Sequence, residues 1–157
     1  MLICFEDIFP GLARESVQEG ANLLINITND GWFKESHQQV QHAANAVFRA
    51  VENRVPLVRC CNNGFTCIVE PTGQISAWLE DPQQGIYMRG LKTAEVKLDD
   101  HPPTFYARFG DVFAFLCLVI TGLFWTSYGW RFLTPRKSKT LSEQSESNGA
   151  DNALRNS

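Results

Sequence analysis

The sequence lacks an excess of positive charge and lacks paired cysteine motifs. Its 157 residues carry 14 Lys and Arg against 17 Asp and Glu, a formal net charge of −3, and no basic patch interrupts the first hundred residues. This balance does not indicate a nucleic-acid partner. None of the five cysteines forms a C-x-x-C pair, so we expect neither a zinc site nor any other metal or cofactor.

Internal repeats and an N-terminal signal peptide are also missing, because Met1–Ile3 leads directly into a strand. The length allows one domain with a hydrophobic core, but not two. Since nothing in the chain would export this domain, we expect further sequence upstream of it.

Residues 1 to about 100 alternate between strand and helix signals. Pro10 suits the first turn of a helix that Gly20 stops, and Asn62-Asn63-Gly64 is a hairpin turn signal. The order predicts an α/β fold in which a mixed sheet carries helices on its faces. The expected strands span 2–5, 22–28, 57–61, 65–70, 75–78 and 93–98, and the expected helices span 10–19 and 37–53.

Two of these segments carry specific expectations about burial. The continuous apolar run at 22–28 is typical of a strand that is covered on both faces of its sheet. In the helix at 37–53, apolar residues recur at spacings of three and four. They predict a single buried stripe made of Val40, Ala43, Ala44, Val47 and Val51.

The longest apolar run spans residues 112–130 and contains no charged residue. Its length approaches the roughly 20 residues that cross a bilayer as a helix, and Trp125, Tyr128 and Trp130 at its far end resemble an aromatic belt. The alternative is a buried core helix, which so uniform an apolar surface disfavours. We therefore predict a transmembrane helix at 109–132.

The residues after this run predict its orientation. A cluster of cations follows it, so the positive-inside rule places the C-terminus in the cytoplasm and residues 1–108 on the outer face. The remaining segment, 133–157, is rich in Ser, Asn, Glu and Gln, and we expect a disordered cytoplasmic tail. The cations are Arg131, Arg136, Lys137 and Lys139.

Cys4 ends the first predicted strand, and a helix start follows at once. A sharp strand-to-helix turn exposes a nucleophile beside free backbone N–H groups. The loop Asn29–Trp32 follows the next strand, so both lie at carboxyl ends of strands and are expected to line one pocket. The alternative is a cysteine that acts as a small buried hydrophobe. Glu6 favours the nucleophile, as an acid two residues on, held on the same side of an extended segment.

The segment Ile3-Cys4-Phe5-Glu6-Asp7-Ile8-Phe9-Pro10 resembles the nucleophile motif of the apolipoprotein N-acyltransferases, in the nitrilase (carbon-nitrogen hydrolase) superfamily. The resemblance extends over roughly residues 2–130. It implies part of a nitrilase-like αββα sandwich at 1–108, followed by the transmembrane helix. Further matching segments are 20–33, His42 with 48–53, 56–59, 62–64 and 71–74.

The resemblance also implies a reaction. The Cys4 thiolate would attack a phospholipid ester and form a thioester, and the N-terminal cysteine amine of an apolipoprotein would then take the acyl chain. The backbone N–H of Phe5 would be an oxyanion donor and Glu6 a supporting acid, while Asn29 and Trp32 are candidates for substrate binding. The implied partners are the phospholipid donor, the apolipoprotein N-terminus and the lipid bilayer. The implied location is the bacterial inner membrane, with residues 1–108 in the periplasm.

In this family a general-base glutamate and a lysine precede the nucleophile, whereas only three residues precede Cys4. We therefore expect the C-terminal portion of such an enzyme, a fragment or a truncated product, that is inactive alone. Two alternatives remain at this point. One is a nitrilase-type amidase, and the other is a non-catalytic remnant anchored in the membrane.

The remaining candidate site residues are mostly expected to have structural roles. His37 and His42 are expected to be solvated or capping residues near a helix start. Arg49 and Glu52 are expected to form an ion pair on one helix face. Trp32 either lines an acyl pocket or anchors its loop. A disulfide across the hairpin is conceivable, but core positions are favoured for the cysteines Cys60, Cys61 and Cys67, and Cys117 is expected to pack within the span.

Overall fold

The computed structural model describes residues 1–98 and 102–133, with side chains up to residue 129. The chain divides into two units, and the boundary falls after Val112. The predicted disordered tail and the cations at 136–139 lie outside the described residues. The predicted domain limits at 108 and 132 stay predictions.

The first unit is a five-stranded mixed sheet with helices, so the predicted α/β class is confirmed. Helix and strand bounds agree with the sequence pattern at most places, and β5 coincides with it. Two short 3₁₀ helices, η1 and η2, follow the first two strands. The elements are β1 (Leu2–Ile3), η1 (Cys4–Ile8), α1 (Pro10–Gln18), β2 (Leu24–Asn29), η2 (Gly31–Phe33), α2 (Gln38–Asn53), β3 (Leu57–Asn62), β4 (Cys67–Val69), β5 (Ile75–Trp78) and α3 (Phe105–Phe109).

The strands lie in chain order across the sheet. β1, β2 and β3 are parallel, and β4 and β5 continue the sheet as antiparallel strands. The pairing aligns Ile3 with Ile27 and Asn26 with Arg59. The carboxyl ends of β1 and β2 therefore lie side by side, as the sequence predicts.

The strand predicted at 93–98 is wrong, because the structure has no strand there. The alternating pattern of this segment is not matched by burial. Val96 is half-buried, whereas the other five side chains are exposed. Because this segment has no apolar face to bury, joining the sheet would not stabilise it.

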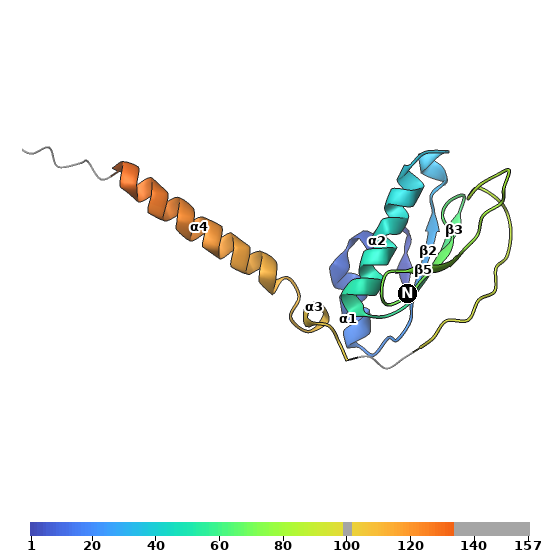
Figure 1. Ribbon diagram of the computed structural model, residues 1–157, viewed down its shortest axis with the longest axis horizontal. Coiled ribbons are helices and arrows are strands. Elements are labelled where there is room, and N and C mark those ends of the chain that lie inside the picture. Colours follow the sequence, from blue (N-terminus) through green and yellow to red (C-terminus); the bar gives the residue numbers. More distant parts are fainter. Residues whose placement is uncertain (99–101, 134–157) are drawn as a thin grey trace, which may run out of the picture. The chain divides into compact units, whose positions relative to one another are not determined.

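Only one face of the sheet is covered in the described part of the chain. α1 and α2 lie together on that face (Figure 1), over a core that includes Leu24 and Leu57. Burial alternates along β2, so that Ile25 and Ile27 are 38% and 49% exposed on the other face, and Ile3 is 55% exposed. The prediction of a strand covered on both faces is therefore wrong for these residues.

The buried face of α2 differs from the predicted apolar stripe. Of the predicted positions, Ala43 is buried and Val47 is partly buried, whereas Val40 and Val51 are about half exposed and Ala44 is exposed. Polar side chains take most of the large buried positions because they meet polar partners across the interface. The buried residues are Gln39, His42, Ala43, Ala46, Arg49, Ala50 and Asn53.

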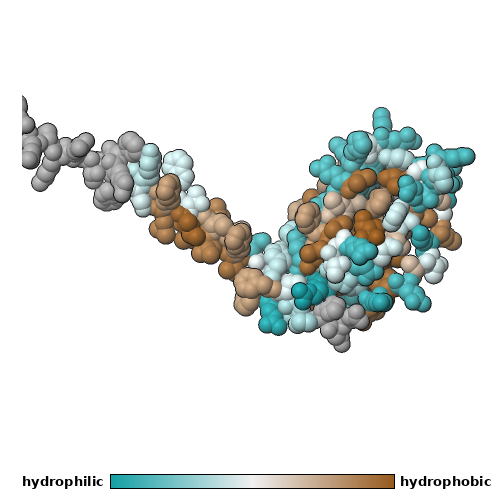
Figure 2. Space-filling view, in the orientation of Figure 1, coloured by the Kyte–Doolittle hydropathy of each residue, from teal (hydrophilic) through white to brown (hydrophobic). Residues whose placement is uncertain are grey.

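The second unit begins at Phe113 and, in the described residues, consists of α4 (Val112–Leu133) without its first residue. The α4 segment Val112–Gly129 has a mean hydropathy of 1.8 and is entirely unburied, and hydrophobic side chains cover much of it (Figure 2). The hydroxyls of Thr121, Thr126 and Ser127 donate to backbone carbonyls of their own helix. Polar groups satisfied within the helix suit an apolar solvent. α4 is therefore long and apolar enough to cross a membrane.

Candidate functional site

Cys4 lies at a sharp turn between β1 and η1. Its φ is +53°, a left-handed conformation that costs energy for a residue with a Cβ. Two hydrogen bonds hold the turn. The Asn26 Nδ2 donates to the Cys4 carbonyl at 3.1 Å, and the Ile3 N–H donates to Glu6 Oε2 at 2.7 Å. The strand therefore ends one residue before Cys4, and the cysteine begins the next element.

The surroundings of the half-buried Cys4 favour its thiolate. The Thr28 hydroxyl lowers the pKa of the Cys4 thiol most, against the opposing effect of burial. The backbone N–H groups of Asn29 and Phe5 and the charge of His42 lower it further. Hydrogen-bond donors directed at sulfur stabilise the anion, which is the reactive form of a cysteine.

Thr28 has two possible acceptors for one proton. Its Oγ1 lies 3.0 Å from Asp30 Oδ1, to which it donates in this geometry. The same hydroxyl is also the main cause of the lowered pKa of the Cys4 thiol. Thr28 therefore bonds the buried carboxylate of Asp30 and also favours the thiolate of Cys4.

Glu6 does not lie on an extended segment, so that expectation is wrong. The positive φ of Cys4 turns the chain into η1, and the Glu6 carboxylate folds back onto the Ile3 N–H. The Phe5 ring is half exposed and stacks on His42, with 4.9 Å between ring centroids. The Phe5 N–H contributes to the lowered pKa of the Cys4 thiol, and its role as an oxyanion donor stays a prediction.

The predicted loop at 29–32 lies beside Cys4, at the carboxyl end of β2. Asn29 Oδ1 accepts from the Gly31 N–H and from Asn62 Nδ2, both at 3.2 Å. The Trp32 side chain is 80% exposed, so it does not anchor the loop. The other interpretation, that Trp32 lines an acyl pocket, stays a prediction.

A closed ring of four buried charged side chains lies beneath this turn, and the sequence did not predict it. Arg59 donates from Nη1 to Asp7 Oδ2 at 2.7 Å and from Nη2 to Asp30 Oδ2 at 2.8 Å. His42 bonds the remaining oxygens, with Nε2 2.9 Å from Asp7 Oδ1 and Nδ1 2.9 Å from Asp30 Oδ1. Because His42 is buried, the expectation that it is solvated or caps a helix is wrong.

The ring is electrically balanced when His42 is protonated. Hydrogen bonds to Asp30 and Asp7 raise the pKa of His42 to about 9, against the effect of burial. Burial raises the pKa of Asp30, but His42 and Arg59 outweigh it and lower that pKa to about 2. Two carboxylates then face two cations, which is the arrangement that makes buried charges tolerable.

The ring reaches the backbone around Cys4 through two further side chains. Asn26 Oδ1 accepts from Arg59 Nη1 at 2.8 Å, while its Nδ2 holds the Cys4 carbonyl. Arg49 Nη1 donates to the Asp7 carbonyl at 2.9 Å. Arg49 also forms the predicted ion pair with Glu52 at 2.6 Å, so that prediction is confirmed.

The remaining predicted residues have no such role in the described structure. His37 is exposed and makes no side-chain cap, in agreement with a solvated residue. All five cysteines are free thiols, and only Cys67 has the buried position that was expected. Cys60 is exposed, which corrects its interpretation as a core residue, whereas the packing of Cys117 within the span stays a prediction. Burial raises the pKa of Cys61 to about 12.

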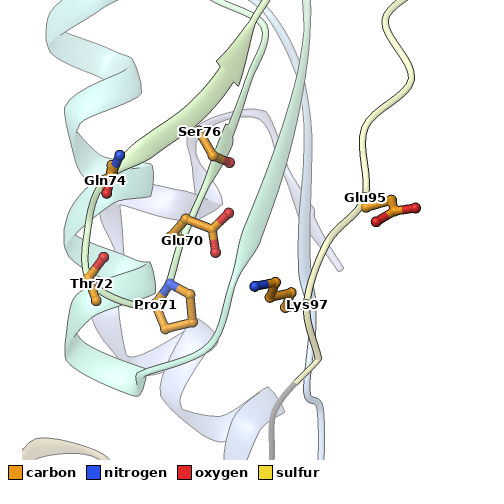
Figure 3. A pocket seen from close by; sticks show the side chains of 7 residues that line it. All are labelled: Glu70, Pro71, Thr72, Gln74, Ser76, Glu95 and Lys97. Carbon is orange, nitrogen blue, oxygen red and sulfur yellow. The ribbon is translucent and has the colours of Figure 1, made fainter.

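Two of the hollows in the described residues bear on the predicted site. A cavity of about 230 Å³ adjoins the charged ring and is lined by Phe5, Ile8, Phe33, Gln38, Gln41, His42 and Asn45. A more polar one of about 440 Å³ lies between the β4–β5 turn and the extended segment that carries Glu95 and Lys97. Figure 3 shows Lys97 directed toward the turn and Glu95 directed away from it. This second hollow contains no cysteine and none of the predicted site residues.

The carbon-nitrogen hydrolase family model matches residues 1–100, which include the whole sheet and the Cys4 turn. The chain therefore belongs to the carbon-nitrogen hydrolase family. Within it, similar curated proteins are named apolipoprotein N-acyltransferase, so the resemblance that the Cys4 motif predicts is confirmed. One from Geobacter metallireducens is 46% identical over 118 residues, 75% of this chain and 22% of that protein.

Other relatives carry related names. Apolipoprotein N-acyltransferase 1 of Treponema denticola is 37% identical over 119 residues, 75% of this chain and 21% of that protein. The Rickettsia bellii apolipoprotein N-acyltransferase is 38% identical over 127 residues, 81% of this chain and 24% of that protein. The chain thus spans about a fifth to a quarter of the length of these relatives.

A solved carbon-nitrogen hydrolase from Helicobacter pylori G27 is also similar. It is 20% identical with a TM-score of 0.46, over 49% of this chain and 34% of that chain.

Proposed function

We propose that this chain is the nucleophile-bearing C-terminal portion of a membrane-bound N-acyltransferase. It would move an acyl chain from a phospholipid, through a thioester on Cys4, to the N-terminal amine of apolipoproteins. The observation that carries the proposal is the Cys4 turn itself. A cysteine with a φ of +53°, directly after the strand β1 and with a lowered pKa, has the geometry of a nucleophile.

In the first step the Cys4 thiolate attacks the ester carbonyl of the phospholipid. The carbon–sulfur bond forms, the carbonyl oxygen becomes an oxyanion, and the Phe5 N–H would donate to it. The carbon–oxygen bond then breaks, and the lysophospholipid alkoxide takes up the proton that Cys4 gave to the general base. An acyl thioester on Cys4 remains.

In the second step the amine of the acceptor attacks the thioester carbonyl. The carbon–nitrogen bond forms, the Cys4 thiolate leaves, and the amine gives its proton to the base, so that an amide is the product. Glu6 supports both steps by holding the turn through the Ile3 N–H. The general-base glutamate and the lysine would come from the part of the enzyme that precedes the nucleophile.

The exposed face of the sheet supports a larger catalytic domain. Ile3, Ile25 and Ile27 lie on that face and are 38–55% exposed. Apolar strand residues at this exposure favour a second layer of protein over the sheet. In the proposed enzyme the preceding portion supplies this layer and completes the sandwich.

Substrate binding is assigned to the loop next to Cys4. Trp32 offers an exposed apolar surface there, and Asn29 presents a side-chain amide at the end of β2. An acyl chain or a lipid surface would contact Trp32, and a peptide would bond the Asn29 amide. α4 would anchor the enzyme in the bacterial inner membrane, with residues 1–108 on the periplasmic side.

A chimera tests this proposal. The matched region of the Geobacter metallireducens relative would be replaced by this chain and expressed in bacteria depleted of their own apolipoprotein N-acyltransferase. We expect restored N-acylation of lipoproteins and a trapped acyl thioester. Cys4→Ser should abolish both, whereas Cys60→Ser, at an exposed cysteine away from the turn, should abolish neither.

Two results would contradict the proposal. A chimera that is stable in the membrane but transfers no acyl chain would refute the assigned reaction, and amide hydrolysis by it would favour an amidase. Continued thioester trapping in Cys4→Ser would remove Cys4 from the role of nucleophile.

A further inference from the structure

α3 is a five-residue helix that directs two phenylalanines outward. Phe105 and Phe109 lie four residues apart on one face, with 4.8 Å between ring centroids, and are 64% and 57% exposed. Ala107, on the opposite face, is buried. The helix thus buries its smallest side chain and leaves its largest apolar ones in contact with solvent.

Polar contacts fix α3 to the sheet-bearing unit in this orientation. Arg14 of α1 donates from Nε to the Ala107 carbonyl at 3.0 Å and from Nη2 to the Arg108 carbonyl at 3.1 Å. Gln18 donates to the Ala107 carbonyl at 2.8 Å. These bonds satisfy carbonyls at the end of the helix, which therefore cannot turn to bury its rings.

The start of α3 is held as well. The Ala107 N–H donates to the hydroxyl of Thr104 at 2.9 Å, and this hydroxyl donates to the Glu52 carbonyl near the end of α2. α3 therefore contacts both α1 and α2, beside which it lies in Figure 1. It is a fixed element of the unit rather than a loose connector.

Very little chain separates these rings from the apolar helix. Only Gly110 and Asp111 lie between Phe109 and the first residue of α4. The three intervening peptide links span at most roughly 11 Å. Gly110 has a φ of +68°, and a Cβ there would lie 3.2 Å from the Arg14 guanidinium, so the turn after α3 is also closely fitted.

We infer that Phe105 and Phe109 form a lipid-facing foot, which inserts into the headgroup region of the bilayer where α4 enters it. Fixed, exposed aromatic rings suit the interface between water and hydrocarbon. Arg108 lies exposed on the same short helix, where a phosphate group would pair with it. Asp111, between α3 and α4, is exposed as well.

The inference rests on the membrane attachment in the proposed function and adds a second attachment to it. A single transmembrane helix leaves the attached unit free to pivot about the connecting residues. A foot that is rigidly joined to α1 removes much of this freedom. The first unit, which carries the Cys4 turn, is then attached to the bilayer at a second point.

Site-directed photocrosslinking tests this placement in the full chain. A benzoyl-phenylalanine would replace Phe105 or Phe109, and separately Leu118 in α4 and Leu91, a 99% exposed residue of the first unit. The chain would be reconstituted in vesicles of phosphatidylethanolamine and phosphatidylglycerol with a radiolabelled phospholipid. We expect labelled lipid adducts at 105, 109 and 118, at least fivefold above the level at 91.

The controls separate failure of the foot from failure of membrane attachment. Adducts at 118 without adducts at 105 and 109 would overturn the foot but leave the attachment intact. No adduct at 118 would refute the attachment itself, and the foot with it. Crosslinks from 105 or 109 to a second copy of the chain, or to another protein, would overturn the inference in favour of a protein interface.

Discussion

The Asn26 side chain joins the Cys4 turn to a buried charge. Its Nδ2 donates to the Cys4 carbonyl at 3.1 Å, and its Oδ1 accepts from Arg59 Nη1 at 2.8 Å. Arg59 also donates to Asp7 and Asp30, which fixes the position of its guanidinium. Only one orientation of the Asn26 amide then directs its oxygen toward Arg59 and its nitrogen toward the Cys4 carbonyl. The Asn26 side chain thus stabilises the strained backbone at Cys4, and the buried charged ring in turn fixes Asn26.

Replacing Asn26 by leucine should therefore loosen the turn. The change leaves the Cys4 carbonyl and one Arg59 N–H unpaired in a buried place, at a cost of about 2–4 kcal/mol. We expect a lower midpoint of urea unfolding in detergent and slower alkylation of Cys4 by iodoacetamide. Asn22→Leu, at an exposed loop position, is the matched control. Equal midpoints for the two variants would show that Asn26 does not hold the turn.

Removing the Thr28 hydroxyl should make Cys4 less acidic. The hydroxyl contributes most to the lowered pKa of Cys4, so Thr28→Val is expected to raise that pKa. The measurement is the pH dependence of Cys4 alkylation, which should move to higher pH. Thr28→Ser keeps a hydroxyl and should keep the original profile. If valine and serine give the same profile, the hydroxyl does not stabilise the thiolate.

Stability should decrease in alkaline solution because His42 loses its proton. The pKa of His42 is raised from 6.5 to about 9, so its contribution is complete below pH 6.5 and is lost as the pH rises through about 9. That contribution is at most about 3 kcal/mol, from 1.36 kcal/mol per pKa unit. The urea midpoint between pH 6 and 10 measures it.

The His42→Gln variant provides the control for this pH dependence. It should be less stable than the original chain near pH 6, and its stability should change little between pH 6 and 10. An unchanged alkaline loss of stability in this variant would assign the effect to another group.

Arg59 and Arg49 should differ in their importance. Arg59 is fully buried and faces two carboxylates. Arg59→Met leaves both carboxylates without this cation, which lowers the free energy of unfolding by about 3–5 kcal/mol. Arg49 pairs with the partly exposed Glu52, which water can solvate when the partner is removed. Arg49→Met is therefore expected to cost less. Thermal unfolding in detergent compares the two, and a greater loss for Arg49→Met would contradict the ring as the main buried charge assembly.

The sequence predicted the turn, the sheet and the apolar helix because these depend on local patterns. Cys4 ends a short apolar run before a proline-started helix, and β5 and α2 show clear periodicity. The mixed class then follows from the order of the elements. The position of Cys4 next to the loop at 29–32 needed only the rule that parallel strands share their carboxyl edge.

The charged ring could not be predicted in the same way, because its members come from three elements and from the residue between β2 and η2. Asp7, Asp30, His42 and Arg59 meet only through the pairing of Asn26 with Arg59 and the packing of α2 on the sheet. Asn26 and Thr28, as polar residues alternating within an apolar strand, were the available signal that the covered face holds polar partners. α3 was missed because five residues are too few for periodicity, although Thr104 and Gly110 mark its ends.

The uncovered face of the sheet also affects how long the chain persists in the cell. A surface that includes Ile3, Ile25 and Ile27 is what chaperones and proteases recognise in unassembled chains. Without a covering layer of protein, the chain is expected to be short-lived or to aggregate, however well its Cys4 turn is formed. The amount of the chain in the cell would then depend on how quickly another layer of protein covers that face.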